Sequence, residues 1–311
     1  MTVCVAAICE TSASVIGASD RMLTAGNVQF QPPVSKCYEL TTSAVLMVAG
    51  EMTIQAEIVA LMRDRINAML SVEPPPEWMR ISEIAAMYSQ VHSELRARRA
   101  ASEFLGPLGL TLETFISRQT EMSSQLVSSL ATEMITKAFP RVEAIIAGVD
   151  RTGAHIYVAD GATISCHDAA GFAAIGNGWY HSNSHLMFSR HGKNAGFTKT
   201  LWLTFSAKKR AEVAPGVGED TDMFAVRGLG QHFEIGDHVL AQFDTVYRET
   251  VELHARADAE SERKADESLT ELLAARAAVG AEEQQAVDTA PSTDGASPPS
   301  DGNQAGTNGG S

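Results

Sequence analysis

Residues 2–20 read TVCVAAICETSASVIGASD, two apolar runs interrupted by a short polar segment. The runs at 2–9 and 14–19 have the length and composition of buried strands, and ETSA between them is typical of a tight turn. Thr2 stands at the head of the first run, and Asp20 directly follows the second. The sequence therefore predicts an antiparallel strand pair that brings residues 2 and 20 to the same end.

The following segments alternate between strand and helix patterns in blocks. A second strand pair is expected near 36–40 and 44–49, and apolar positions then recur at helical spacing over 54–69. Two more helices are predicted, one over 82–95 and one over 112–134, with a break at Gly106, Pro107 and Gly109 between them.

The second half of the chain returns to strands. A strand meander is predicted over 143–166, a helix after Gly178, a helix over 199–212, a strand over 222–226, and a final amphipathic helix that includes Val239. Because consecutive strands favour antiparallel pairing, this order predicts an α+β fold with two sheets, each covered by helices.

The composition excludes several classes of protein. The formal net charge is −14 and the pI is near 5.1, and such a surface repels nucleic acid and anionic membranes. No apolar stretch reaches the roughly 18 residues that span a bilayer, and the start lacks the positive region of a signal peptide. The four cysteines form no C-x-x-C pair, which indicates reduced thiols. We expect a soluble, cytoplasmic protein with no nucleic-acid or membrane partner.

The chain is predicted to have three parts. Residues 1–254 contain enough apolar sequence for one folded domain, with a helical insertion at about 100–135. Residues 255–280 are rich in Ala, Glu and Arg, which favours an exposed helix or linker. Residues 281–311 consist mainly of Pro, Gly, Ser, Asn and acidic residues, which predicts a disordered acidic tail.

The second residue carries two chemical groups once Met1 is removed. A small side chain such as that of Thr2 permits removal by methionine aminopeptidase, which leaves an N-terminal threonine. Its α-amino group has a pKa of about 7.7–8.0 and can act as the base for its own hydroxyl. Thr2 is therefore a candidate nucleophile.

Three motifs follow Thr2 in order: VIGASDR with Asp20, VSKCYEL with Lys36, and LMVAGE with Gly50. This ordered set resembles the proteasome β-subunit family, which includes the bacterial HslV peptidase. The resemblance implies the four-layer αββα sandwich of N-terminal-nucleophile (Ntn) hydrolases. It also implies that Lys36 lowers the pKa of the Thr2 hydroxyl or amine, that Asp20 orients Lys36, and that the Gly50 N–H stabilises the oxyanion.

The resemblance covers roughly residues 2 to 250. AIIAGVDRTGAHIYVADGATISC is similar to the central hairpin of the family, and AAIGNGWYHSN is similar to its Gly-Ser-Gly segment, with Asn177 at the serine position. Position in the family implies an apolar substrate pocket and cleavage after hydrophobic residues. The residues implied for this pocket are Leu23, Val34, Val48 and Met52.

The chain also departs from the family pattern. Ala214 and Val217 stand where the family places an Asp and a Ser, although Gly218 is retained; Glu212 is a candidate substitute. The first hairpin is two residues longer than usual, so strict register would make Cys4 the nucleophile after self-cleavage. Insertion in a turn costs little, which favours Thr2.

The resemblance thus implies a threonine-type peptidase that cleaves peptide bonds in a homo-oligomeric ring, which an ATP-dependent unfoldase would serve. The alternatives are a noncatalytic ring subunit and a stand-alone Ntn amidase. No cofactor is expected. His181 and His185 lie four residues apart but have no evident third ligand, so no metal is expected either.

Overall fold

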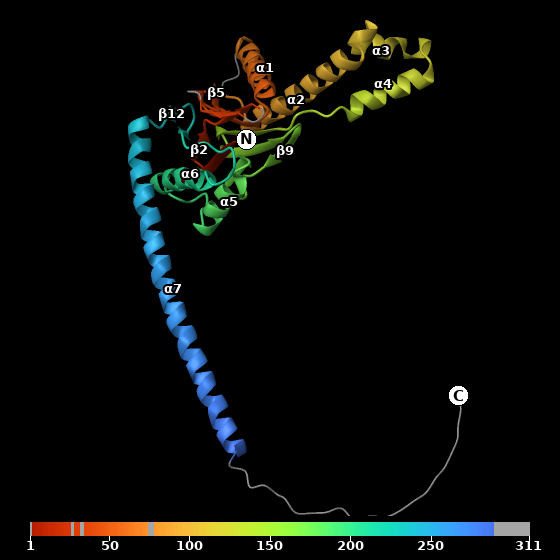
Figure 1. Ribbon diagram of the computed structural model, residues 1–311. Coiled ribbons are helices and arrows are strands. Elements are labelled where there is room, and N and C mark those ends of the chain that lie inside the picture. The colour runs from red at the N-terminus through yellow and green to blue at the C-terminus, as the bar shows by residue number, and fades with distance from the viewer. Residues whose placement is uncertain (1, 26–27, 32–33, 74–77, 289–311) are drawn as a thin grey trace, which may run out of the picture. The chain divides into compact units, whose positions relative to one another are not determined.

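The computed structural model describes residues 2–25, 28–31, 34–73 and 78–288 (Figure 1). The fold is mixed α/β and contains two five-stranded antiparallel sheets, as predicted from the sequence. The chain divides into two compact units, Met1–Tyr247 and Arg248–Ser311. The strands of the described residues all belong to the first unit.

The first sheet has the strand order β10-β1-β2-β11-β12. Its central strands, β1 (Val3–Cys9) and β2 (Ser14–Asp20), are completely buried and pair with Cys4 opposite Ser19. The remaining strands are β10 (Phe172–Gly176), β11 (Thr221–Arg227) and β12 (His232–Glu234). β10 was not predicted as a strand, because its five residues read as part of a glycine-flanked turn.

The second sheet has the sequential order β5-β6-β7-β8-β9. Its strands are β5 (Cys37–Thr41), β6 (Ala44–Gly50), β7 (Val142–Asp150), β8 (Gly153–Asp160) and β9 (Thr163–Cys166). A separate two-stranded sheet is formed by β3 (Leu23–Ala25) and β4 (Val28–Phe30), which follow β2 directly.

Each large sheet packs against the other on one side and against helices on the opposite side. Cys4, Ala6 and Ile8 contact residues of the second sheet, whereas Val5 and Cys9 pack against helices. Successive side chains of a strand point to opposite faces, so β1 needs apolar residues at every position. This requirement explains the uninterrupted apolar run at the start of the chain.

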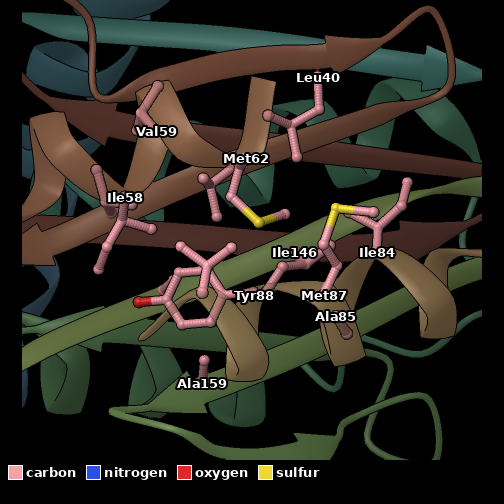
Figure 2. Packing of buried hydrophobic residues seen from close by; sticks show 14 of the residues in the cluster. Leu40, Ile58, Val59, Met62, Ile84, Ala85, Met87, Tyr88, Ile146 and Ala159 are labelled. Carbon is pink, nitrogen blue, oxygen red and sulfur yellow. The ribbon is translucent and has the colours of Figure 1, made fainter. Parts of the chain in front are cut away.

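The outer face of the second sheet is covered by α1 (Met52–Leu70) and α2 (Ile81–Phe104). Figure 2 shows Tyr88 of α2 lying among Ile58, Met62 and Ala159 in this cluster. The first sheet is covered by α5 (Trp179–Phe188) and α6 (Phe197–Ala211), together with Leu240 at the start of the last helix. In Figure 1 these two helix pairs lie on opposite sides of the strands.

The segment between α2 and β7 forms a small helical subdomain. It contains η1 (Gly106–Leu108), α3 (Leu112–Arg118), η2 (Gln119–Glu121) and α4 (Ser124–Thr136). Figure 1 shows α3 and α4 beyond the end of α2, and Leu105, Phe115 and Leu130 form their own core. The single helix predicted over 112–134 is wrong, because Thr111 and Ser123 each cap a separate helix.

The last helix, α7, runs from Asp237 to Asp288. The part within the first unit packs through Leu240, Phe243 and Tyr247. In the second unit the helix is continuous, and residues 251–281 are exposed. Of the tail predicted over 281–311, residues 289–311 lie outside the described residues. Among the helices of the described ranges, none combines the length and apolar character that crossing a bilayer requires.

Candidate active site

The ends of three strands place Thr2, Asp20 and Lys36 together. Thr2 precedes β1 and Asp20 ends β2, and the antiparallel register of these strands brings both to one edge of the first sheet. Lys36 directly precedes β5 of the second sheet. The sheets face each other, so the lysine side chain reaches the edge where the other two residues lie.

The three side chains contact one another directly. The Thr2 hydroxyl donates to Asp20 Oδ1, and Lys36 Nζ donates to Thr2 Oγ1. Lys36 Nζ also donates to Asp20 Oδ1 at 3.0 Å and to the carbonyl of Met22. These contacts use all three N–H bonds of the ammonium group, which fixes its orientation.

The cluster is almost completely shielded from solvent. Thr2 is 2% exposed, Asp20 is 0% exposed and Lys36 is 3% exposed. Burial weakens the screening between charges, so the ammonium group acts more strongly on the hydroxyl than it would in water. A buried ion pair also costs desolvation free energy that can exceed the attraction between the charges, so stability alone does not explain it.

Asp20 is held by backbone groups from three segments. Its Oδ1 accepts from Val3 N at 2.9 Å, and its Oδ2 accepts from Met22 N and Gly218 N at 3.0 Å each. These three hydrogen bonds fix the position of the carboxylate beside Lys36.

A second buried lysine supports the segment that contains Gly218. Lys208 of α6 is 0% exposed, and its Nζ donates to the carbonyls of Gly218 and Glu219 at 2.8 Å each and to Glu212 Oε1 at 2.6 Å. Burial lowers the pKa of Lys208, and Glu212 opposes that effect. This residue was missed in the sequence, where the run KKR reads as a solvated helix end.

Gly50 ends β6 in a backbone conformation that favours glycine, with φ of +123°. A Cβ there would lie 2.3 Å from the carbonyl oxygen of Arg141. Cys4, two residues after Thr2, approaches the carbonyl of Val48, two residues before Gly50, with an Sγ to oxygen distance of 3.6 Å. Gly50 therefore lies at the same end of the paired sheets as Thr2.

Glu143 is a further residue that the sequence did not indicate. It lies on β7, yet its Oε2 accepts from Gly176 N of the other sheet at 2.9 Å. Gly176 pairs with Val3 and has φ of +80°. Glu143 thus fixes the segment beside Thr2, a role that only the tertiary arrangement of the two sheets creates.

Two further segments, around Asn177 and around residues 214–217, contain residues that the resemblance singled out. Asn177 is exposed, and its Nδ2 lies 3.5 Å from the carbonyl of Pro215. Ala214 and Val217 form a small apolar cluster with Val3 and Ala211.

Glu212, the candidate substitute named from the sequence, forms ion pairs with Lys208 at 2.6 Å and with Lys209 at 2.8 Å. It helps to neutralise the buried Lys208, which in turn supports the segment of Gly218.

The four residues expected to line a substrate pocket occupy different environments. Val34 and Met52 are exposed, and Leu23 is partly buried. Val48 is fully buried in the cluster that joins the second sheet to α1 and α2. Val48 therefore presents no accessible surface to a ligand in this structure.

Cys4 lies in an environment unsuited to a nucleophile. It is fully buried between the two sheets, and its Sγ donates to the carbonyl of Val48. Burial raises the pKa of the Cys4 thiol well above its usual value, and the nearby Cys37 adds to this. Because the thiolate is the reactive form, Cys4 is a weaker candidate than Thr2.

Within the described ranges, no three His, Cys, Asp or Glu side chains come together in a metal-binding arrangement. His185 Nε2 is 2.8 Å from Ser206 Oγ, a contact that joins α5 to α6.

Comparison with known proteins does not extend this picture. No protein-family model matches the chain, and no curated protein matches it. The buried contact among Thr2, Asp20 and Lys36 is therefore the basis on which a function is proposed.

Proposed function

We propose that this protein is an N-terminal-nucleophile hydrolase of the threonine peptidase type, with Thr2 as its nucleophile after loss of Met1. The fold proposed is the four-layer αββα sandwich of that superfamily. Two facing antiparallel sheets, with α1 and α2 outside one and α5 and α6 outside the other, support this fold.

The contact of the Thr2 hydroxyl with Lys36 Nζ and Asp20 Oδ1 carries the proposal. A threonine hydroxyl is a weak nucleophile, and a neighbouring ammonium group stabilises the negative charge that develops on its oxygen. A reactive Thr2 hydroxyl explains why the protein buries this ion pair despite its desolvation cost.

The proposed reaction proceeds in two steps. Thr2 Oγ1 attacks the peptide carbonyl while its proton passes to the free α-amino group, and the backbone N–H of Gly50 donates to the resulting oxyanion. The C–N bond then breaks, the amine product leaves with the proton, and an ester links the substrate to Thr2. Water activated by the same α-amino group hydrolyses the ester and restores the hydroxyl.

The proposed assembly is a ring of identical subunits that acts on protein or peptide substrates delivered by an ATP-dependent unfoldase. Exposed aromatic and aliphatic residues on α5 support contact with another subunit, because large apolar patches commonly mark interfaces. These residues are Trp179, Tyr180, Met187 and Phe188.

Two active-site reagents test the chemistry. A peptide epoxyketone requires both the hydroxyl and the adjacent amine, whereas a β-lactone requires the hydroxyl alone. Intact mass of the processed protein should show one adduct with each reagent, mapped to Thr2 by peptide sequencing and absent from Thr2→Ala. Retention of Met1 should prevent the epoxyketone adduct. Labelling at another residue, or equal labelling of Thr2→Ala, would refute the assignment.

Native mass spectrometry separates the alternatives. A closed ring that reacts at Thr2 supports the peptidase, and a monomer that reacts at Thr2 indicates a stand-alone amidase. A ring that resists both reagents after Met1 has been removed indicates a noncatalytic subunit.

A further inference from the structure

A cavity of about 860 Å³ lies where the helical subdomain joins the second sheet. Its walls come from the second half of α2, from residues 134–142 and from the turn between β8 and β9. Small-molecule sites have volumes of about 300–1,000 Å³, so the cavity is large enough for a metabolite-sized ligand. None of its lining residues belongs to the Thr2 cluster.

The buried wall of this cavity contains an unsatisfied polar group. His92 is 6% exposed, and its Nδ1 has no hydrogen-bond partner in the described part of the chain. Its ring packs edge-on against Phe139, with ring centroids 5.1 Å apart. Buried polar groups are nearly always hydrogen-bonded, so His92 is incompletely satisfied. The opposite edge of its ring faces Gly161, another lining residue, with Nε2 3.7 Å from the position of a Cβ there, and Nε2 is therefore the atom toward which a ligand would bind.

The protonation state of His92 fits a neutral hydrogen-bonding role. Burial lowers the pKa of His92, and the nearby Arg96 lowers it further, against a smaller opposing effect of Asp160. A neutral imidazole has one N–H donor and one acceptor nitrogen. His92 can therefore bind a ligand without contributing a charge of its own.

The rim of the cavity carries three basic side chains, two of which are neutralised by carboxylates. Lys137 is paired with Glu103, and Arg141 is paired with Glu143 and Asp160. Arg96 donates to the carbonyl of Ile135 at 3.1 Å, and among the described residues no carboxylate lies within ion-pair distance of it. Arg96 thus has donors and charge available for an anion.

The lining also contains apolar residues that would contact a hydrophobic body. The residues concerned are Ala97, Ala100, Leu112, Met134, Phe139 and Val142. We propose that this cavity binds a small organic anion with an apolar body, whose carboxylate pairs with Arg96 and which forms a hydrogen bond with His92. The site is independent of the peptidase activity proposed for Thr2.

Calorimetric titration of the full chain with 2-naphthoate, and with the neutral 2-naphthamide, tests this site. We expect saturable binding of one naphthoate per chain and at least tenfold weaker binding of the amide, because a charge-assisted hydrogen bond is lost. Arg96→Met keeps the aliphatic stem and should weaken naphthoate binding about tenfold. Arg118→Met, at an exposed arginine paired with Glu121, should leave it unchanged.

His92→Phe preserves the ring contact with Phe139 and should weaken naphthoate binding at least threefold. Should that variant fail to fold, the Arg96 comparison decides alone, since Arg96 is exposed. The proposal is overturned if no saturable binding occurs, if naphthoate and naphthamide bind equally, or if Arg96→Met binds naphthoate as tightly as the parent chain.

Discussion

Lys36 Nζ lies 3.0 Å from Asp20 Oδ1, and both side chains are buried. The two residues come from different sheets, so this ion pair also connects the sheets at the edge where Thr2 lies. Its two effects, on stability and on reactivity, can be separated by substitution.

Lys36→Met should leave Asp20 buried without its counter-charge. We expect a loss of about 3–5 kcal/mol in the free energy of unfolding, since removal of one partner strands the other charge. The double variant Lys36→Met with Asp20→Leu should regain part of that free energy of unfolding. Denaturant unfolding of the two variants measures the difference. The double variant should remain unreactive toward β-lactone, and a reactive double variant would contradict the role given to Lys36.

Gly50→Ala should destabilise the protein by at least about 2 kcal/mol, because φ of +123° strains an alanine and its Cβ meets the Arg141 carbonyl. Gly106→Ala is a matched control, since no atom lies within 4 Å of a Cβ there. Thermal unfolding of both variants checks this. Equal melting temperatures would show that the backbone at Gly50 relaxes freely.

Lys208→Met should loosen the segment of Gly218 and Glu219, whose carbonyls lose their donor. We expect about 2–3 kcal/mol of destabilisation and slower acylation of Thr2, because Gly218 N helps to hold Asp20. Lys209→Met, which removes a less buried partner of Glu212 and Asp244 but no donor to a backbone carbonyl of the 218–219 segment, should cost less than Lys208→Met. Similar losses in the two variants would argue against a special role for Lys208.

Stability should fall as the pH drops below neutrality, partly through His191. This side chain is buried against the Ile8 carbonyl, 3.0 Å from its Nε2, and burial lowers its pKa. Below the ordinary pKa of about 6.5 the unfolded chain takes up the proton first, so stability declines until the folded pKa is passed.

His191→Gln should reduce that decline, measured as the free energy of unfolding between pH 7 and pH 5. Burial also lowers the pKa of His92 and His167, which remain in both proteins. The difference between the two curves is therefore the relevant quantity. Parallel curves would show that His191 does not contribute.

Cys4→Ala should retain β-lactone labelling at Thr2. The thiol is buried between the sheets, where its raised pKa keeps it protonated. Truncation removes a small buried group, so we expect a modest loss of about 1–2 kcal/mol in unfolding free energy together with an unchanged labelling mass. Disappearance of the label while the protein remains folded would move the reactive position to Cys4.

The strands predicted most directly are those with both faces buried. β1 and β6 are uninterrupted apolar runs and β2 and β7 are mostly apolar, since each lies between another sheet and a helix layer. β10 is a short apolar run, FAAIG, and it was missed because it borders the glycine-flanked turn at Gly176 and Gly178. The split between α3 and α4 was hidden because Met122, between them, falls on the same apolar spacing.

Thr2, Asp20 and Lys36 could be selected from the sequence because their ordered motifs resemble those of a known family, but their mutual contact is seen only in the structure. Lys208 and Glu143 could not, because their roles depend on backbone groups far away along the chain. Lys208 is buried because the segment of Gly218 and Glu219 packs over the end of its side chain.

The hydrogen bond from Gly218 to Asp20 spans 198 positions of the chain. A ribosome has therefore made most of the polypeptide before the carboxylate receives its last donor. A nascent or truncated chain that ends before Gly218 lacks this donor, so the anchoring of Asp20 is completed only after most of the first unit has been synthesised.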